Sequence, residues 1–413
     1  MKQTLFTGFS PSTRPKDMRI ALSFLLFPWK WSSWKKGSFR KDITASIEGY
    51  FGEQTNALVY DSGRSALYEA LKAMGIGKGD EVLVQAYTCM VVVNAIKWTG
   101  ATPVYIDIEK ETLNMDPEKA RQKCSSQTKA IIIQHTFGLP ANIDALMDVA
   151  KAFHLKTIED CAHSLGARYK GKLTGTFADV GMLSFGGEKV ISCVRGGALI
   201  TKDRDLFHSL EKSQQALPES PRRVVRQHLL HVVLFPIGKR FYHLFFGKLL
   251  LKLVKVLHIT NKIIYPEEKV GKRVPWYPSK LPNALAALLV SQFPEIETFN
   301  THRKHIAVLY KKALEGKTSI EYQVDDASHI YLRYPLFMEN PRAVRARAKH
   351  KGVLLGDWYS LVIGPGDVDL NEAGYVEHMC PVAEERTSKA INLPTNIHIQ
   401  DADVPRIIAT LFE

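Results

Sequence analysis

A single lysine, Lys189, occupies an unusual position in the stretch "LSFGGEKVISCVRGGALITKD", residues 183–203. It lies between a Ser-Phe pair and a glycine pair, in a setting too apolar for an ordinary surface charge. A lysine that loses solvation in such surroundings has a lowered pKa, which keeps its neutral amine available as a nucleophile. Lys189 is therefore the first candidate for chemistry.

The stretch "IEDCAHSLGA" places Asp160 and His163 directly after an apolar run. A carboxylate buried there is costly unless it has a partner. A fixed positive charge, such as a protonated ring nitrogen, would hold Asp160 ionised and would itself be held protonated. The alternative is a helix-capping aspartate beside a half-buried histidine, and these residues alone do not decide between the two.

The stretch "DSGRSAL" has Ser62, Gly63, Arg64 and Ser65 where a strand should turn into a helix. Unpaired backbone N–H groups and the positive end of the helix favour a phosphate at such a turn. Taken alone, the stretch is explained more simply by a capped helix with a glycine turn. Together with the strand-end aspartate and the isolated lysine, it matches what pyridoxal phosphate requires: a phosphate cup, a pyridinium partner and an amine.

The elements that would position these residues form an alternating pattern. Strands are predicted from short apolar runs bounded by turns, at residues 57–60, 80–87, 102–108, 130–136, 155–162 and 197–203. Helix-length segments separate them, which indicates a mostly parallel sheet with helices on both faces. In such α/β sheets the binding crevice lies at the carboxyl ends of the strands.

Length and charge limit the possible functions. At 413 residues, the chain should form two lobes around a sizeable core. The formal charge of +13 allows nucleic acid, anionic lipid or anionic substrates as partners. Because runs of like charge, zinc-finger spacing and aromatic RNA-binding motifs are all missing from the sequence, we expect no nucleic-acid partner.

The cysteines indicate a reducing compartment. All five are scattered without a C-x-x-C pair, which fits neither a disulfide framework nor a thiolate metal site, so we expect no metal. The apolar stretch "IALSFLLFPWKW" near the N-terminus is too short to span a bilayer and has no small-residue cleavage site after it. We therefore expect a cytoplasmic protein without a signal peptide.

From about residue 57 onward the sequence resembles the DegT/DnrJ/EryC1/StrS family of sugar aminotransferases. The resemblance rests on the order and spacing of several stretches, which are "SGRSAL", "GDEVLVQAYTC", "GATPVYIDIEKETLNMD", "IEDCAHSLGA", "GTFADVGMLSFGGEKVI" and "CPVAEERTSKAINLPTN". It implies a fold type I enzyme of the aspartate-aminotransferase class, with a large domain built on a mostly parallel sheet and a smaller C-terminal α+β domain. It also implies pyridoxal phosphate as cofactor and a homodimer.

The resemblance implies a role for each candidate residue. Lys189 is similar to the lysine that binds the cofactor covalently, Asp160 to the partner of the pyridine nitrogen, and His163 to the glutamine or histidine beside the ring. Ser184 and the turn at 62–65 match the family's phosphate contacts. Because relatives with dehydratase chemistry replace the lysine, often with histidine, Lys189 favours transamination.

Two departures from the family pattern affect the site. Where many relatives carry an aromatic residue that stacks on the cofactor, this chain has Cys89, with Tyr87 nearby, so either Tyr87 stacks on the ring or a smaller side chain covers it. The family's glycine–asparagine–arginine motif, which reaches toward the neighbouring subunit, is replaced by "VPWYPSKLPNALAALL" at 274–289. This replacement puts the familiar nucleotide-sugar substrate in doubt.

We expect three regions along the chain: a basic, aromatic arm at 1–45, a large cofactor-binding domain at 46–290 and a small domain at 291–413. The small domain should begin with a long helix near Pro294 and continue as strand, helix and helix. The large domain carries an apolar, basic insert near 222–260, which Pro236 and the basic residues after it should divide into pieces too short to span a bilayer.

The second piece of the insert has lysines at 248, 252 and 255, which form one stripe on an otherwise apolar helix. It would either pack in a lobe or dimer interface or lie on anionic lipid with the lysines at the surface. The arm's "FLLFPWKWSSWKK" also pairs tryptophan with lysine, and it leaves these alternatives evenly balanced.

We expect an aminotransferase that moves an amino group from an amino acid, such as glutamate, to a keto sugar linked to a nucleotide. One alternative is an enzyme with the same cofactor that acts on another, or a lipid-linked, carbonyl at the membrane surface. Another is a silent scaffold that docks at a membrane. The retention of both Lys189 and Asp160 argues against a scaffold.

Overall fold

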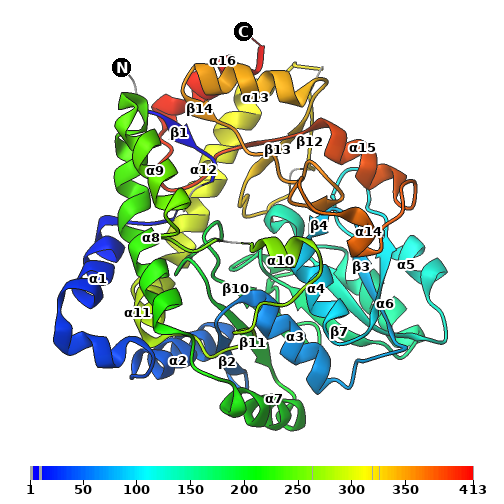
Figure 1. The fold of residues 1–413 in the computed structure, drawn as a ribbon. Coiled ribbons are helices and arrows are strands. Elements are labelled where there is room, and N and C mark those ends of the chain that lie inside the picture. The colour runs from blue at the N-terminus through cyan, green and yellow to red at the C-terminus, as the bar shows by residue number, and fades with distance from the viewer. Residues whose placement is uncertain (1–2, 9–11, 263, 319, 325, 413) are drawn as a thin grey trace.

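The computed structural model describes residues 3–8, 12–262, 264–318, 320–324 and 326–412 (Figure 1). At its centre is a seven-stranded sheet of order β2-β11-β10-β7-β6-β3-β5. Strand β11 is antiparallel to both neighbours, and the other adjacent pairs are parallel. The strands are β2 (Asn56–Tyr60), β3 (Glu81–Gln85), β5 (Thr102–Ile106), β6 (Thr128–Gln134), β7 (Lys156–Asp160), β10 (Val180–Ser184) and β11 (Gly197–Thr201).

Helices cover both faces of this sheet because its strands are apolar on both sides. On strand β3, Val82 and Val84 join the core under α3 and α4, whereas Leu83 between them joins the core under α5 and α6. The large-domain helices that follow the strands are α3 (Gly63–Ala73), α4 (Met90–Lys97), α5 (Pro117–Lys123), α6 (Ile143–Ala152) and α7 (Arg204–Ala216). The predicted α/β architecture is confirmed.

The N-terminal segment and the insert pack together beside the sheet. The N-terminal segment contains β1 (Leu5–Phe6), α1 (Pro15–Leu26), η1 (Pro28–Trp34) and α2 (Phe39–Phe51), and the insert contains α8 (Arg222–Arg240), η3 (Tyr242–Leu244) and α9 (Phe246–Val256). The segment after the insert contains α10 (Pro266–Lys269) and α11 (Asn283–Gln292). Helix α1 contacts α8 and α11, α2 contacts α11 and β2, and α9 contacts α8. No helix in the described residues is long and apolar enough to cross a membrane.

The insert divides into two helices as expected, but the break follows the Lys239–Arg240 pair and does not occur at Pro236. Helix α8 continues through Pro236 to Arg240, and the chain turns only at 241–245, where Phe245 adopts a φ of 63°. Proline removes one backbone donor from a helix, but here the helix packs along its length on α1 and α9. Packing therefore outweighs the local cost of the proline.

The small lobe follows the order expected from the sequence. Its main elements are η4 (Phe293–Glu295), α12 (Ile296–Leu314), β12 (Glu321–Tyr322), β13 (Tyr334–Phe337), α13 (Pro341–His350), β14 (Val353–Leu354), α14 (Leu370–Ala373), α15 (Pro381–Lys389), β16 (Ala390–Leu393) and α16 (Val404–Phe412). Strands β12, β13 and β16 form an antiparallel sheet. Strand β1 pairs in parallel with β14, so the N-terminal segment contacts the small lobe as well as the large one.

Candidate active site

A cavity of about 360 Å³ lies at the carboxyl ends of three neighbouring strands. The last residues of β6, β7 and β10, which are Gln134, Asp160 and Ser184, all line it. The beginning of α3 contributes a second wall, and Trp358 and Tyr359 of the small lobe contribute a third. The position matches the crevice expected for an α/β sheet.

Lys189 lies in a short turn directly after β10. Its backbone N–H donates to the carbonyl of Gly186 at 3.2 Å, and its own carbonyl accepts from the hydroxyl of Ser12 at 3.0 Å. Its Nζ atom lies 5.2 Å from the ring centroid of Trp358. Burial lowers the pKa of this amine, and the negative charge of Asp160 partly opposes the shift. The turn thus holds a partly desolvated amine in the cavity wall.

Asp160 ends β7 with its carboxyl group in the same cavity. Its Oδ1 accepts from the backbone N–H of Ala162 at 2.9 Å. Burial raises the pKa of this carboxyl, while that hydrogen bond and the nearby positive charge of Lys189 act to lower it. A cation in the cavity would therefore stabilise the ionised form of Asp160.

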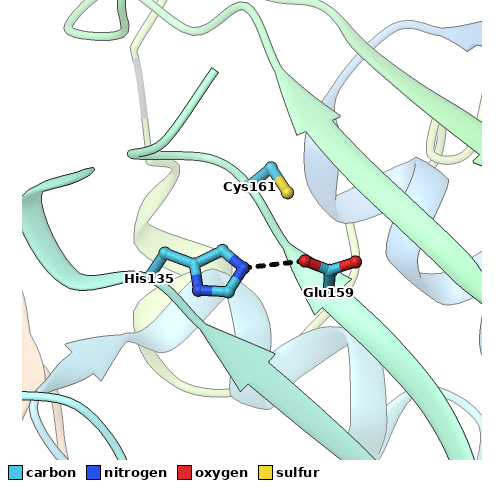
Figure 2. Close-up of side chains that lie close together, drawn as sticks. All are labelled: His135, Glu159 and Cys161. Atoms are coloured by element: carbon cyan, nitrogen blue, oxygen red, sulfur yellow. Dashed lines mark hydrogen bonds and ion pairs between the residues drawn. The ribbon is translucent and has the colours of Figure 1, made fainter. Parts of the chain in front are cut away.

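The preceding residue, Glu159, points away from the cavity toward His135 and Cys161 (Figure 2). Its carboxylate accepts from His135 Nε2 at 3.0 Å and from the backbone N–H groups of residues 175, 177 and 178. Nδ1 of His135 accepts from Ala141 N, so its proton resides on Nε2. Because these hydrogen bonds already use both ring nitrogens of His135 and both carboxylate oxygens of Glu159, we assign this pair a structural role next to Asp160.

His163 is held in a stack of aromatic rings. Its ring lies 5.7 Å from Phe137 and 5.5 Å from Trp358, centroid to centroid, with interplanar angles of 7° and 18°. Nδ1 accepts from the backbone N–H of Phe137 at 3.3 Å, which leaves the proton on Nε2, 3.5 Å from the Tyr359 hydroxyl. Burial and the charges of Lys189 and Arg333 hold the pKa of His163 well below its usual value, so it is neutral at pH 7.

The start of α3 is a capped helix N-terminus that borders the cavity. Ser62 caps the helix, because its Oγ accepts from the backbone N–H of Ser65 at 3.3 Å. Ser62, Gly63, Arg64 and Ser184 line the cavity, whereas Ser65 lies outside the lining, with its hydroxyl against Ser62. At Gly63 a Cβ atom would lie 3.1 Å from the side chain of Ser184, so glycine brings the two segments close together.

Cys89 and Tyr87 lie in different places. Cys89, at the start of α4, lines the cavity, and burial raises the pKa of its thiol. Tyr87 is fully buried outside the cavity lining, with its ring 5.4 Å from that of Tyr359 in an edge-to-face contact. Of the two alternatives, this geometry favours a small side chain, Cys89, beside the cofactor.

The comparisons with known proteins agree with this geometry. The DegT/DnrJ/EryC1/StrS aminotransferase family matches residues 29–226 and 251–412. The chain belongs to this family. It is 27% identical to the GDP-perosamine synthase of Escherichia coli O157:H7, over 98% of this chain and 97% of that protein. It is 26% identical to the UDP-N-acetyl-3-dehydro-alpha-D-glucosamine 3-aminotransferase of Acidithiobacillus ferrooxidans, over 91% and 88%.

Among solved structures, NtdA from Bacillus subtilis with bound cofactor PMP has a TM-score of 0.74 at 20% identity, over 100% of this chain and 85% of that one. The enzyme is thus a pyridoxal-phosphate-dependent member of the DegT/DnrJ/EryC1/StrS aminotransferases, as the sequence resemblance implied. The residues that line the cavity fit this cofactor. They include the Lys189 amine, whose pKa is lowered, the Asp160 carboxyl group, and the N-terminal end of a helix at Ser62–Arg64.

Several residues of this aminotransferase site were not foreseen. Arg333 of the small lobe lies with its guanidinium carbon 3.5 Å from the ring centroid of Trp358 and forms an ion pair with Glu188, next to Lys189. Trp358 is also fixed by Asn392, which accepts from its backbone N–H and donates to its carbonyl, both at 2.8 Å. Asn392 lies in a stretch that carries the family resemblance, but no sequence pattern indicates that Asn392 or Arg333 contacts Trp358.

A buried ion pair lies beside the cavity at the start of α3. Arg64 pairs with Glu268, whose side chain is fully buried, and Glu268 also accepts from the backbone N–H of Tyr265 at 2.8 Å. Arg195, which lines the cavity, lies 5.1 Å over the ring of Tyr265 and donates to the carbonyl of Lys262 at 3.0 Å. The segment after the insert therefore supplies one wall of this chain's own site.

Proposed function

We propose that the enzyme transfers an amino group from an amino acid, with glutamate as the first candidate, to a keto group of a nucleotide-linked sugar. The observation that carries the proposal is the cavity that brings Lys189, Asp160 and the start of α3 together. The two relatives named above support the acceptor class, because their names specify GDP- and UDP-linked sugars. The product would enter the synthesis of a surface glycan or a secondary metabolite.

The chain's own residues would divide the work as follows. Bound pyridoxal phosphate supplies an electron sink for the carbon that loses its proton. Asp160 keeps the ring nitrogen protonated, and the helix start with Ser184 and Arg64 holds the phosphate. Nζ of Lys189 is the group that would take and return a proton at the substrate carbon. Neutral His163 lines the cavity and would add no charge beside the bound ring.

We further propose that the enzyme works as a homodimer, as the resemblance to this family implies. The replaced stretch at 274–289 starts with Tyr277 and Trp276 in a small aromatic cluster and continues into α11, which is buried in the core of this chain. Residues of α11 are therefore not available to a second copy, whereas Pro275 before the helix is exposed. Sedimentation velocity of the purified protein gives the oligomeric state directly.

The function can be tested with purified protein and its visible absorbance. Wild-type protein incubated with pyridoxal phosphate should show an absorbance band that borohydride reduces and fixes to the chain, with mass spectrometry locating the adduct on Lys189. Glutamate should remove the band in a half-reaction. A screen of nucleotide-linked keto sugars, followed by one lipid-linked keto sugar, then identifies the acceptor by mass. An unchanged band with glutamate and every other amino acid would contradict an aminotransferase.

A further inference from the structure

Helix α9 presents an apolar row to solvent. Its inner side contacts α8 through buried residues such as Gly247 and Val254. Phe246 is 74% exposed and Val256 is 61% exposed, although apolar side chains of this size are normally covered. We call this row the α9 face; its members are Phe245, Phe246, Leu249, Leu253, Val256 and Leu257.

Three lysines border the α9 face along one side. Lys248, Lys252 and Lys255 are all exposed, and their spacing of four and three places them on one stripe of the helix. The surrounding chain has no acidic residue from 220 to 266. An apolar row beside a row of uncompensated cations is the pattern of a helix that lies in the interface of an anionic bilayer.

A second exposed apolar group lies on the N-terminal segment. The aromatic tip, which comprises Leu26, Phe27, Trp29 and Trp31, is exposed at the junction of α1 and η1. Phe27 and Trp29 stack on each other with centroids 4.8 Å apart. The chain from 18 to 41 also contains lysines and arginines but no acidic residue. Tryptophan and lysine together are typical of the membrane–water boundary.

Helix α8 contacts α9 and also α1, at whose end the aromatic tip lies. Helices α1 and α9 each contact α8, and both lie on the same side of the molecule in Figure 1. The family match stops at residue 226 and resumes at 251, so most of α8 and the start of α9 lie outside the part that this chain shares with its family. The first half of the α9 face, from Phe245 to Leu249, therefore lies outside the family match, whereas Leu253, Val256 and Leu257 lie inside it.

We propose that the α9 face and the aromatic tip bind the surface of an anionic lipid bilayer, with α9 parallel to the membrane plane. A second copy of the chain would fit this surface poorly, since pairing the α9 faces of two copies brings lysines together with no nearby acidic residue. A bilayer supplies both an apolar layer and phosphate groups. This inference goes beyond the proposed function and needs no cofactor chemistry, so the two can fail separately.

The first test is co-sedimentation of the full chain with vesicles. Wild-type protein should pellet with phosphatidylcholine vesicles that contain phosphatidylglycerol, and much less with phosphatidylcholine alone. The variant K248Q/K252Q/K255Q should lower the partition coefficient for anionic vesicles by roughly a hundredfold at low salt. The matched control is K123Q/K151Q/K156Q, which removes three exposed lysines around α5 and α6 and should bind like wild type.

The second test locates the contact. Brominated lipids should quench part of the wild-type tryptophan fluorescence on binding, and W29F/W31F should lose most of that quenching. The F246S/L253S variant should bind both vesicle types less while keeping its cofactor absorbance and its molar mass. The proposal is overturned if wild type does not pellet with anionic vesicles, if the lysine variant pellets equally well, or if F246S/L253S lowers the molar mass, since a second copy would then cover the face.

Discussion

His231 offers a test of how tightly the insert is packed. It lies on α8 with 2% of its surface exposed, and its ring stacks on that of Phe235 at 3.7 Å between centroids. Burial, with a smaller contribution from the positive charge of Lys239, lowers the pKa of His231 to about 3. An unfolded histidine has a pKa of about 6.5. Between pH 6.5 and about pH 3, residue 231 is therefore protonated in the unfolded chain but neutral in the folded chain.

The sign and size of the effect follow from this difference. The unfolding free energy that the neutral His231 preserves is at its full value above pH 6.5, and it decreases as the pH falls toward the folded pKa of His231. Each pH unit in that window costs about 1.4 kcal/mol of unfolding free energy per histidine. For His231 alone, the loss between pH 7 and pH 5 is about 2 kcal/mol. His228 and His398, whose pKa values are also lowered by burial, add to the loss in the wild type.

The measurement is urea denaturation at pH 7 and pH 5, followed by circular dichroism. The His231→Leu variant should lose about 2 kcal/mol less than wild type over this interval. His208→Leu is the control, because His208 is 71% exposed on α7 and the change should leave the pH dependence as in wild type. If His231→Leu and wild type lose the same free energy, His231 is solvated and α8 is not packed as described.

Three further changes test the site and its surroundings. Asp160→Asn should retain the borohydride-fixed chromophore but lose turnover roughly a hundredfold or more, and full activity would remove Asp160 from the mechanism. Gly197→Ala should weaken cofactor binding, measured by absorbance titration, because a Cβ there would lie 2.4 Å from the backbone nitrogen of Gly63. Lys239→Met should raise the free energy of unfolding by about 1–3 kcal/mol at pH 7, measured by urea denaturation, because burial lowers the pKa of Lys239 to about 8. This gain should vanish above pH 10.5, where the lysine is neutral in the unfolded chain as well.

The sequence was sufficient for the parts of the fold that depend on local pattern. Apolar runs bounded by turns identified most central strands, and the residue types at their ends pointed to Lys189, Asp160 and the start of α3. Strand β10 was missing from the predicted strands because Gly181 interrupts its apolar run. Glycine is required there, since a Cβ would lie 2.4 Å from the carbonyl oxygen of Gly175.

The remaining features depend on contacts between distant segments. Nothing local indicates that Arg333 will cover Trp358 or pair with Glu188, because the three residues lie in separate loops. The passage of α8 through Pro236 likewise depends on its neighbours α1 and α9. Local propensity predicts a break at a proline, and only tertiary packing can override it.

The pairing of the N-terminal segment with later parts of the chain has a consequence for biosynthesis. Ser12 donates to the carbonyls of Lys189 and Val190, and β1 pairs with β14 at residues 353–354. A chain that leaves the ribosome from its N-terminus must wait for most of its length before this first strand finds its partner. Residues 5–6 therefore reach their final contacts only after residue 354 has been synthesised, which places this pairing among the late steps of folding.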